Sequence, residues 1–245
     1  MIGLGTLINV LAIAIGASVG VLVGNRISQS ARDIVTDALG LVTLLIGAFS
    51  VVAISDSALT SSLPAGAPVL ILLAALVVGG LLGNYLKIEI RMENLGEKLK
   101  KRFARGSEAS NRFVEGFVSA SLVFAVGPLA ILGSISDGLG RGIEQLLLKS
   151  TLDFFASIAF AASLGWGVLF SAIVVGLYQG IFTVLGFFLG EVLSLAAISL
   201  LNAVGGLLLI AVGIRLLRLR QIPVGDLLPA LLLAPIFLAI VSFWV

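Results

Sequence analysis

Apolar residues fill this chain in long runs separated by short polar segments. Each run is close to the 20 residues that an α-helix needs to cross the hydrocarbon core of a bilayer. The runs cover residues 3–23, 34–54, 69–86, 114–132, 143–164, 168–189, 195–214 and 224–244. We therefore predict an all-α integral membrane protein with seven or eight transmembrane helices, which form a single polytopic membrane domain over residues 1–245.

Two stretches carry residues that interrupt the apolar pattern. Pro128 follows Gly127 inside the fourth run, and proline removes a backbone hydrogen bond and kinks a helix. Glycines, serines and an aspartate follow from Gly133 to Gly140, which favours a loop or re-entrant turn. Broken backbone at membrane depth is tolerated where it faces protein or a water-filled cavity. We expect broken helices at both stretches and look for function beside them.

The placement of basic residues predicts the topology, because Lys and Arg favour the cytoplasmic side. If all eight runs cross, thirteen of the fifteen basic residues fall on one side. If the run 143–164 did not cross, the three arginines between residues 215 and 220 would fall outside. We therefore favour eight crossings of the inner (cytoplasmic) membrane with both termini outside, and keep seven as the alternative.

The longest polar segment, 87–112, holds eight of the basic residues with glutamates between them. Its apolar positions are partly helical in spacing, which predicts an amphipathic helix at the cytoplasmic interface. Attraction to anionic lipids is the expected consequence. Nucleic-acid binding has no supporting motif in the sequence.

Composition removes several classes of function. The 245 residues are 59% hydrophobic and 11% charged, and they include no Cys and no His; the mean hydropathy is +1.20. Thiolate or imidazole metal sites and His general bases are therefore excluded. No phosphate-binding G-x-x-x-x-G-K-[ST] motif occurs. We expect no metal, no cofactor and no enzymatic activity.

Charged residues in the fifth run are the strongest pointer to function. Lys149 and Asp153 are four positions apart, so on a helix they can form an ion pair, with Ser150 beside them. A charge at membrane depth is costly and usually marks a pathway, a relay or a buried pair. The pair is either a structural salt bridge or a gate in which Asp153 takes a proton or a cation and Lys149 turns to an anionic group.

Further polar residues extend this candidate site. Ser134, Ser136 and Asp137 offer hard oxygen ligands for a cation or proton, or they form a polar external turn with Asp137 as the N-cap of the next helix. Gln179 and Thr183 share a helix face that either lines a solute site or joins helices by hydrogen bonds. The candidate ligands are completed by one residue of the first run, Asn9.

A weak internal similarity links two pairs of runs. Residues 37–40 resemble 202–205, and residues 20–24 resemble 186–190. The offset corresponds to five spans, an odd number that inverts orientation. This pattern is what an inverted-repeat transporter would show, and chance similarity among common small and apolar residues is the alternative.

Several of these motifs resemble a family of bacterial and archaeal membrane proteins known as domain of unknown function 554. The matching patterns are Gly3-x-Gly5-Thr6-x-x-Asn9, Gly127-Pro128-x-x-Ile131-x-Gly133-Ser134, Asp137-Gly138-Leu139, Lys149-Ser150-x-Leu152-Asp153 and Tyr178-Gln179-Gly180. The resemblance covers nearly the whole chain. It implies a polytopic inner-membrane protein and a transporter role, without a substrate.

The leading hypothesis is a secondary transporter for a small polar or anionic solute, coupled to protons or cations. Asp153 and Asp137 would be the coupling carboxylates, and Lys149 the counter-charge. An ion channel using the same residues is one alternative. A structural or regulatory membrane protein without transport activity is the other, and an oligomer is compatible with each.

Overall fold

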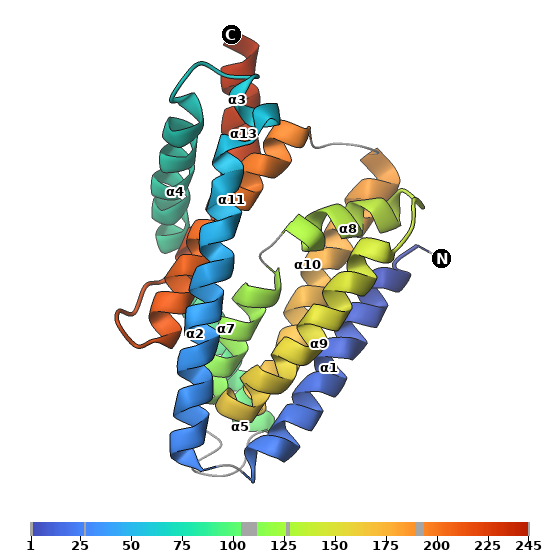
Figure 1. Ribbon diagram of the computed structural model, residues 1–245, viewed down its shortest axis with the longest axis vertical. Coiled ribbons are helices and arrows are strands. Elements are labelled where there is room, and N and C mark those ends of the chain that lie inside the picture. The colour runs from blue at the N-terminus through green and yellow to red at the C-terminus, as the bar shows by residue number, and fades with distance from the viewer. Residues whose placement is uncertain (1, 27, 104–111, 126–127, 190–193, 245) are drawn as a thin grey trace.

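The computed structural model describes residues 2–26, 28–103, 112–125, 128–189 and 194–244 of the chain, and these residues form helices and no strand. The helices are α1 (Leu4–Gly24), α2 (Gln29–Val51), η1 (Val52–Ser55), α3 (Ser57–Thr60), α4 (Ala67–Leu86), α5 (Ile88–Phe103), α7 (Phe113–Ala125), α8 (Pro128–Gly138), α9 (Glu144–Leu164), α10 (Gly167–Leu189), α11 (Leu195–Leu216), α12 (Val224–Leu227) and α13 (Pro229–Trp244). They pack as one elongated bundle (Figure 1).

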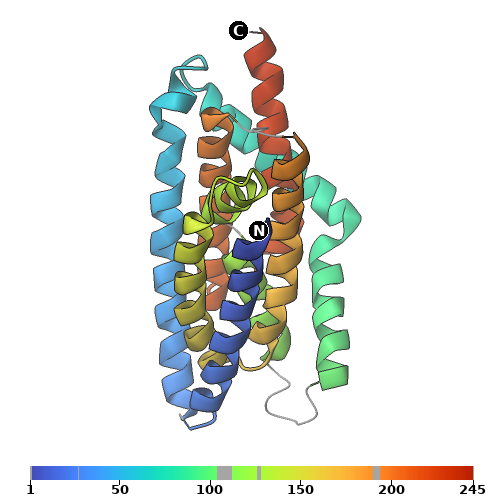
Figure 2. The same cartoon turned by 90° about the vertical axis from the view of Figure 1, so that its right-hand side faces the viewer.

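The all-α membrane fold is confirmed. In the described part of the chain, seven helices are long and apolar enough to cross a membrane. The pair α7 and α8, bent by 62° between 113–125 and 129–138, adds an eighth crossing if it counts as one broken span. Figure 2 shows the bundle from the side, with α13 extending past it at the C-terminal end.

Helices α7 and α8 both pack against α10, one at each end of it. At one end Gly167 lies against the backbone of Phe113, and at the other Gly186 lies against the backbone of Ile135. These two glycines are separated by about 28 Å of helix, close to the hydrocarbon thickness of a bilayer. The bent pair therefore accompanies α10 along its length, and counted as one broken span it gives up to eight candidate crossings.

The broken helix expected near Gly127 and Pro128 is found, because α7 ends at Ala125 and α8 begins at Pro128; Gly127 itself lies outside the described residues. The loop expected from Gly133 to Gly140 is wrong over most of its length. Helix α8 continues to Gly138. Gly133 packs against the side chain of Leu146, so its missing side chain serves helix packing.

Two close helix pairs organise the bundle. Helices α1 and α9 run parallel: Gly16, Gly20 and Gly24 lie in turn against the backbone near Phe154, Ile158 and Ala162. Small residues at this spacing let two helices approach closely in a membrane. The two helices lie side by side along their length (Figure 1).

Helices α2 and α11 form the second pair and run antiparallel. Gly47 lies against the backbone of Gly206, and Gly40 faces Gly213, so the contacts are reciprocal about a local two-fold. An inverted repeat also produces such an arrangement, and the repeat itself stays a prediction.

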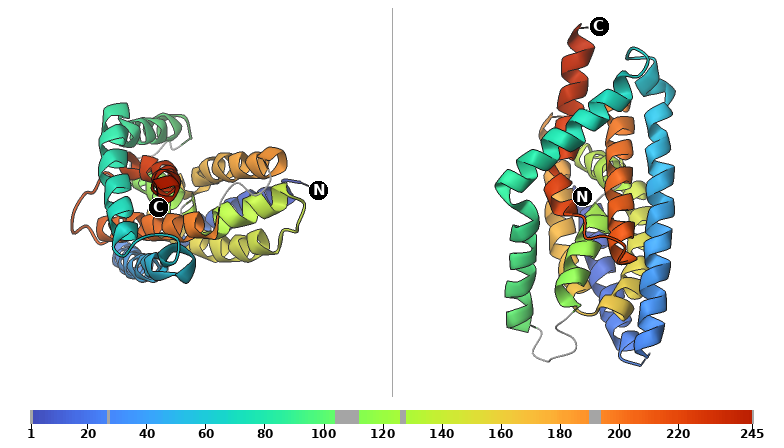
Figure 3. Two further views of the ribbon diagram at one scale, coloured as in Figure 1. Left: turned by 90° about the horizontal axis from the view of Figure 1, so that it is seen from above. Right: turned by 90° about the vertical axis from the view of Figure 1, so that its left-hand side faces the viewer.

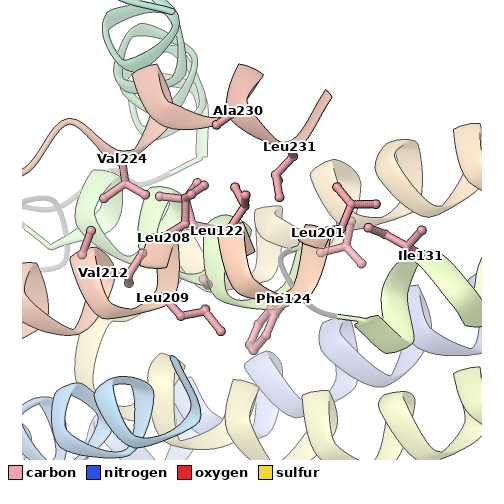
Figure 4. Packing of buried hydrophobic residues seen from close by; sticks show 14 of the residues in the cluster. Leu122, Phe124, Ile131, Leu201, Leu208, Leu209, Val212, Val224, Ala230 and Leu231 are labelled. Atoms are coloured by element: carbon pink, nitrogen blue, oxygen red, sulfur yellow. The ribbon is translucent and has the colours of Figure 1, made fainter. Parts of the chain in front are cut away.

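The apolar core surrounds α11, most of whose residues are buried. Leu122 and Phe124 from α7 and Ile131 from α8 pack on one side of it, and Ala230 and Leu231 from α13 pack on another (Figure 4). Helix α11 is therefore the central helix of the bundle.

An amphipathic helix was predicted within 87–112, and α5 is that helix. It follows α4 after a bend at Lys87, whose φ is +53° (Figure 3, right). Its inner face is not free, because Gly96 lies against Phe117 and Val114 of α7. Lys98 and Lys101 are exposed on the other side.

Candidate functional site

Asp137 lies in the last turn of α8 and is 2% exposed. Its two carboxylate oxygens accept the backbone N–H groups of Gly3 and Gly5, each over 3.0 Å. Helix α1 has no side-chain cap of its own, so Asp137 supplies the cap and a negative charge at the positive end of the helix dipole. The interpretation of Asp137 as N-cap of the next helix is wrong, because Ile143 occupies that position in α9.

The two serines of α8 do not join the other candidate residues. The buried Ser134 donates its hydroxyl to the carbonyl of Ala130 over 2.6 Å. Ser136 is half-buried, and its backbone carbonyl accepts the N–H of Arg141 over 3.0 Å. Ser150, on α9, similarly donates to the carbonyl of Leu146 over 2.6 Å. The hydroxyl protons of Ser134 and Ser150 are therefore used inside their own helices.

The central polar cluster forms between α1, α9 and α10. Lys149 and Asp153 make the predicted ion pair one turn apart on α9, with side chains 7% and 10% exposed. Asn9 of α1 donates its Nδ2 to Asp153 Oδ2 over 3.0 Å and to Gln179 Oε1 of α10 over 3.3 Å. A continuous chain of polar groups thus runs from the lysine through the carboxylate to two amides.

The two amides of this cluster are incompletely satisfied. Asn9 and Gln179 are both fully buried, yet Asn9 Oδ1 and Gln179 Nε2 have no hydrogen-bond partner among the residues that the structure describes. A buried donor or acceptor left unpaired costs about 1–3 kcal/mol. The cluster therefore presents one free acceptor and one free donor in a site closed to solvent.

Hydroxyl groups border the cluster on its outer side. Thr183 Oγ1 donates to the carbonyl of Gln179 over 3.0 Å and lies 3.3 Å from Thr6 Oγ1. Sequence reasoning missed Thr6, although it precedes Asn9 by three positions and so shares its helix face. We define the central cluster as Thr6, Asn9, Lys149, Asp153, Gln179 and Thr183.

Close packing of α1 on α9 brings the cluster together. A Cβ at Gly16 would overlap the carbonyl of Phe154, and a Cβ at Gly20 would overlap that of Ile158. Without side chains at these positions, the two backbones lie in contact. Asn9, two turns before Gly16, is thereby held within hydrogen-bond distance of Asp153.

A second set of polar contacts closes the opposite end of the bundle. Asp33 of α2 binds Arg112 over 2.7 Å and Arg218 over 3.3 Å. Arg112 also donates to the carbonyl of Ser163 at the end of α9 over 3.3 Å. A cavity of about 70 Å³ lies beside it and is lined by Arg32 and Arg112 among others.

Buried charged side chains also connect α5 to the end of α11. Arg215 binds Glu89, whose other oxygen accepts the N–H of Gly225 over 2.6 Å. In return Asp226 accepts the N–H of Glu89 over 2.8 Å. Sequence reasoning did not predict these contacts.

Within the described ranges, no three Asp or Glu side chains gather in one place. Amides, hydroxyls and a single ion pair are suited to hydrogen-bonding a small polar solute, and a carboxylate beside a lysine can exchange a proton.

Comparison with known proteins places the chain among relatives of the same length. The model of the family described as "Protein of unknown function (DUF554)" matches residues 4–239. The chain belongs to this family. All residues of the central cluster fall inside the matched range, so the resemblance seen in the sequence is confirmed.

Two relatives of this DUF554 chain match almost from end to end. One is "Uncharacterized membrane protein YdfK" of Bacillus subtilis (strain 168), 28% identical over 97% of this chain and 96% of that protein. The other is "Uncharacterized protein YqgA" of Escherichia coli (strain K12), 31% identical over 94% of each. No solved structure matches the chain.

Proposed function

We propose that this DUF554 protein is a secondary transporter of the cytoplasmic membrane, which carries a small polar or anionic solute together with a proton. The central cluster is the binding site, and no covalent chemistry takes place there. The main support for the proposal comes from two buried polar atoms, Asn9 Oδ1 and Gln179 Nε2. Neither has a hydrogen-bond partner among the described residues, although both side chains are fully buried.

A solute would satisfy these two atoms. One that offers a donor and an acceptor, such as a carboxylic acid or an amide, can bond both amides and relieve their unmet hydrogen bonds. Asn9, Lys149, Asp153 and Gln179 lie about 8–15 Å from the outer ends of their helices, as helix geometry gives it. That depth is where transporters of several folds bind their substrates.

Charge balance supports coupling to protons. Lys149 and Asp153 neutralise each other in a medium where an unpaired charge is costly. If Asp153 takes up a proton, Lys149 loses its partner and attracts an anion, and the net charge of the site is unchanged. A monovalent anion and one proton would therefore move together without net charge.

Helix organisation supports alternating access. Transporter sites often lie beside discontinuous helices, and the broken span of α7 and α8 packs along α10, which contributes Gln179 and Thr183. The ion pairs of Asp33 with Arg112 and Arg218 close the end opposite the N-terminus. The structure would represent a closed form in which the site faces neither side.

Proteoliposomes that enclose a pH-sensitive dye test this function. A panel of monocarboxylates, halides and amino acids is added outside, and an active solute should acidify the lumen at a saturable rate. The double variant Lys149→Met with Asp153→Leu should abolish acidification while remaining folded. Thr151→Ala, whose exposed hydroxyl bonds only its own helix, is the matched control.

Two results would contradict the proposal. Wild-type rates in the double variant would separate the ion pair from transport. A non-saturating ionic current without solute-driven acidification would identify a channel instead.

Anionic lipids are the expected neighbours of α5. Lys98 and Lys101 are exposed on the face turned away from α7, and each basic side chain near an anionic surface contributes about 1 kcal/mol of attraction. Loss of activity in liposomes without anionic lipid would support this contact.

A further inference from the structure

Asn202 presents an unsatisfied carboxamide at the side of the bundle. It lies on α11 about 10 Å from the first residue of that helix, so it is inside the hydrocarbon region. The side chain is partly exposed, and it makes no hydrogen bond to any residue that the structure describes. Lipid chains offer no hydrogen bonds, so a carboxamide at this depth is expected to face protein.

The surface around Asn202 is hollowed. A depression of about 340 Å³ is lined by Ile46, Phe49, Ser50 and Ala53 of the α2 segment together with Asn202. Ser50 donates its hydroxyl to the carbonyl of Ile46 over 2.9 Å and so does not satisfy the amide. Phe49 lies beside the hollow, and 69% of its surface is exposed. Its side chain therefore protrudes next to a recess.

We propose that this face of α2 and α11 is the interface of a homodimer. The two copies insert in the membrane with the same orientation, so a two-fold axis relating them is parallel to the membrane normal. Asn202 then meets Asn202 of the partner subunit at the same depth. A carboxamide carries both a donor and an acceptor, so two of them pair reciprocally, and Phe49 fills the recess of the other copy.

A second copy is favoured over other occupants by this self-complementarity. An unrelated partner would need its own polar residue at the same depth. A lipid chain would fill the hollow but leave the carboxamide unpaired. The interface is also separate from the central cluster, which lies on α1, α9 and α10. The dimer proposal therefore does not depend on the proposed transport function.

The absence of cysteine from the chain makes the test direct. A single-cysteine variant, Ala53→Cys in the lining of the hollow, keeps the carboxamide of Asn202 and is expressed in membranes and oxidised with copper phenanthroline. Ser50→Cys, also in the lining of the hollow, is the second interface probe, and Leu177→Cys of α10 and Leu70→Cys of α4, both 66% exposed, are the controls. We expect a covalent dimer for the first two variants and at least tenfold less for the controls.

A second variant checks that the amide itself associates the copies. Asn202→Leu removes the polar group, and because the side chain makes no hydrogen bond to the described residues of its own subunit, the thermal midpoint of the monomer should be unchanged. Single-molecule subunit counting in lipid bilayers should show at least a tenfold weaker dimer. Crosslinking of Leu177→Cys or Leu70→Cys in place of Ala53→Cys, or equal dimerisation by Asn202→Leu, overturns the proposal.

Discussion

Gly5 donates its backbone N–H to the carboxylate of Asp137 over 3.0 Å, although 132 positions separate the two residues. The carboxylate also binds Gly3, so the end of α8 holds the beginning of α1. This anchor sets the height of α1 beside α9 and α10, and with it the position of Asn9 in the central cluster. A residue expected at an ion site thus positions the helix that carries the site.

Removal of this anchor should destabilise the protein. Asp137→Ala leaves two N–H groups of α1 without acceptors, and we expect a loss of about 2 kcal/mol in unfolding free energy. Denaturant unfolding in detergent, followed by tryptophan fluorescence, measures it. Asp37→Asn, at an exposed position of α2, should be neutral. Full stability of Asp137→Ala combined with loss of transport would instead make Asp137 part of the solute site.

The ion pair on α9 should show strong coupling between its members. Lys149→Met alone leaves Asp153 buried and unpaired, which costs about 3–5 kcal/mol. The double variant Lys149→Met with Asp153→Leu removes both charges, so it should be more stable than either single variant. A double-mutant cycle by thermal unfolding measures the difference. Additive effects of the two substitutions would show that the charges do not interact.

Side chains introduced between α1 and α9 should separate the two helices. Gly20→Leu places a branched side chain against the backbone of Ile158, and we expect a cost of at least about 3 kcal/mol together with loss of solute binding. Gly180→Ala on α10 is the control, because a Cβ there meets nothing within 4 Å. Equal thermal midpoints for both variants would contradict the close packing described for α1.

The buried carboxylate of Glu89 should matter far more than its neighbour Glu93. Glu89→Ala leaves the guanidinium of Arg215 and the N–H of Gly225 without their acceptor, so a loss of about 3 kcal/mol is expected. Glu93 lies 3.8 Å from Arg215 with its side chain 47% exposed, and Glu93→Ala should cost under about 0.5 kcal/mol. Urea titration of both variants in parallel distinguishes them.

The transmembrane helices were predictable because each apolar run is as long as a bilayer is thick. Lys149 and Asp153 were predictable as a pair because four positions on a helix bring side chains together. The loop expected from Gly133 to Gly140 was wrong for a related reason. Glycine usually marks turns in soluble proteins, whereas in a membrane helix such as α8 it often permits close contact with a neighbour.

Contacts between distant segments were beyond the reach of local patterns. Glu89 and Arg215 are 126 positions apart, and no pattern in either segment predicts contact with the other. The role of Thr6 depends on α1 lying beside α10, which follows only from the assembled bundle. The unpaired atoms of Asn9 and Gln179 likewise depend on side-chain directions that spacing does not specify.

The hydrogen bond from Asn9 to Asp153 also has a consequence for the order of events during synthesis of the protein. The two residues are 144 positions apart, so at about 5–20 residues per second the ribosome adds Asp153 roughly 7–29 s after Asn9. For most of that interval neither Asp137 nor Asp153 has been made, so the cap of α1 and the partner of Asn9 are both missing. Helix α1 is therefore made well before the groups that complete its polar contacts, and the cluster can form only after α8, α9 and α10 have been added.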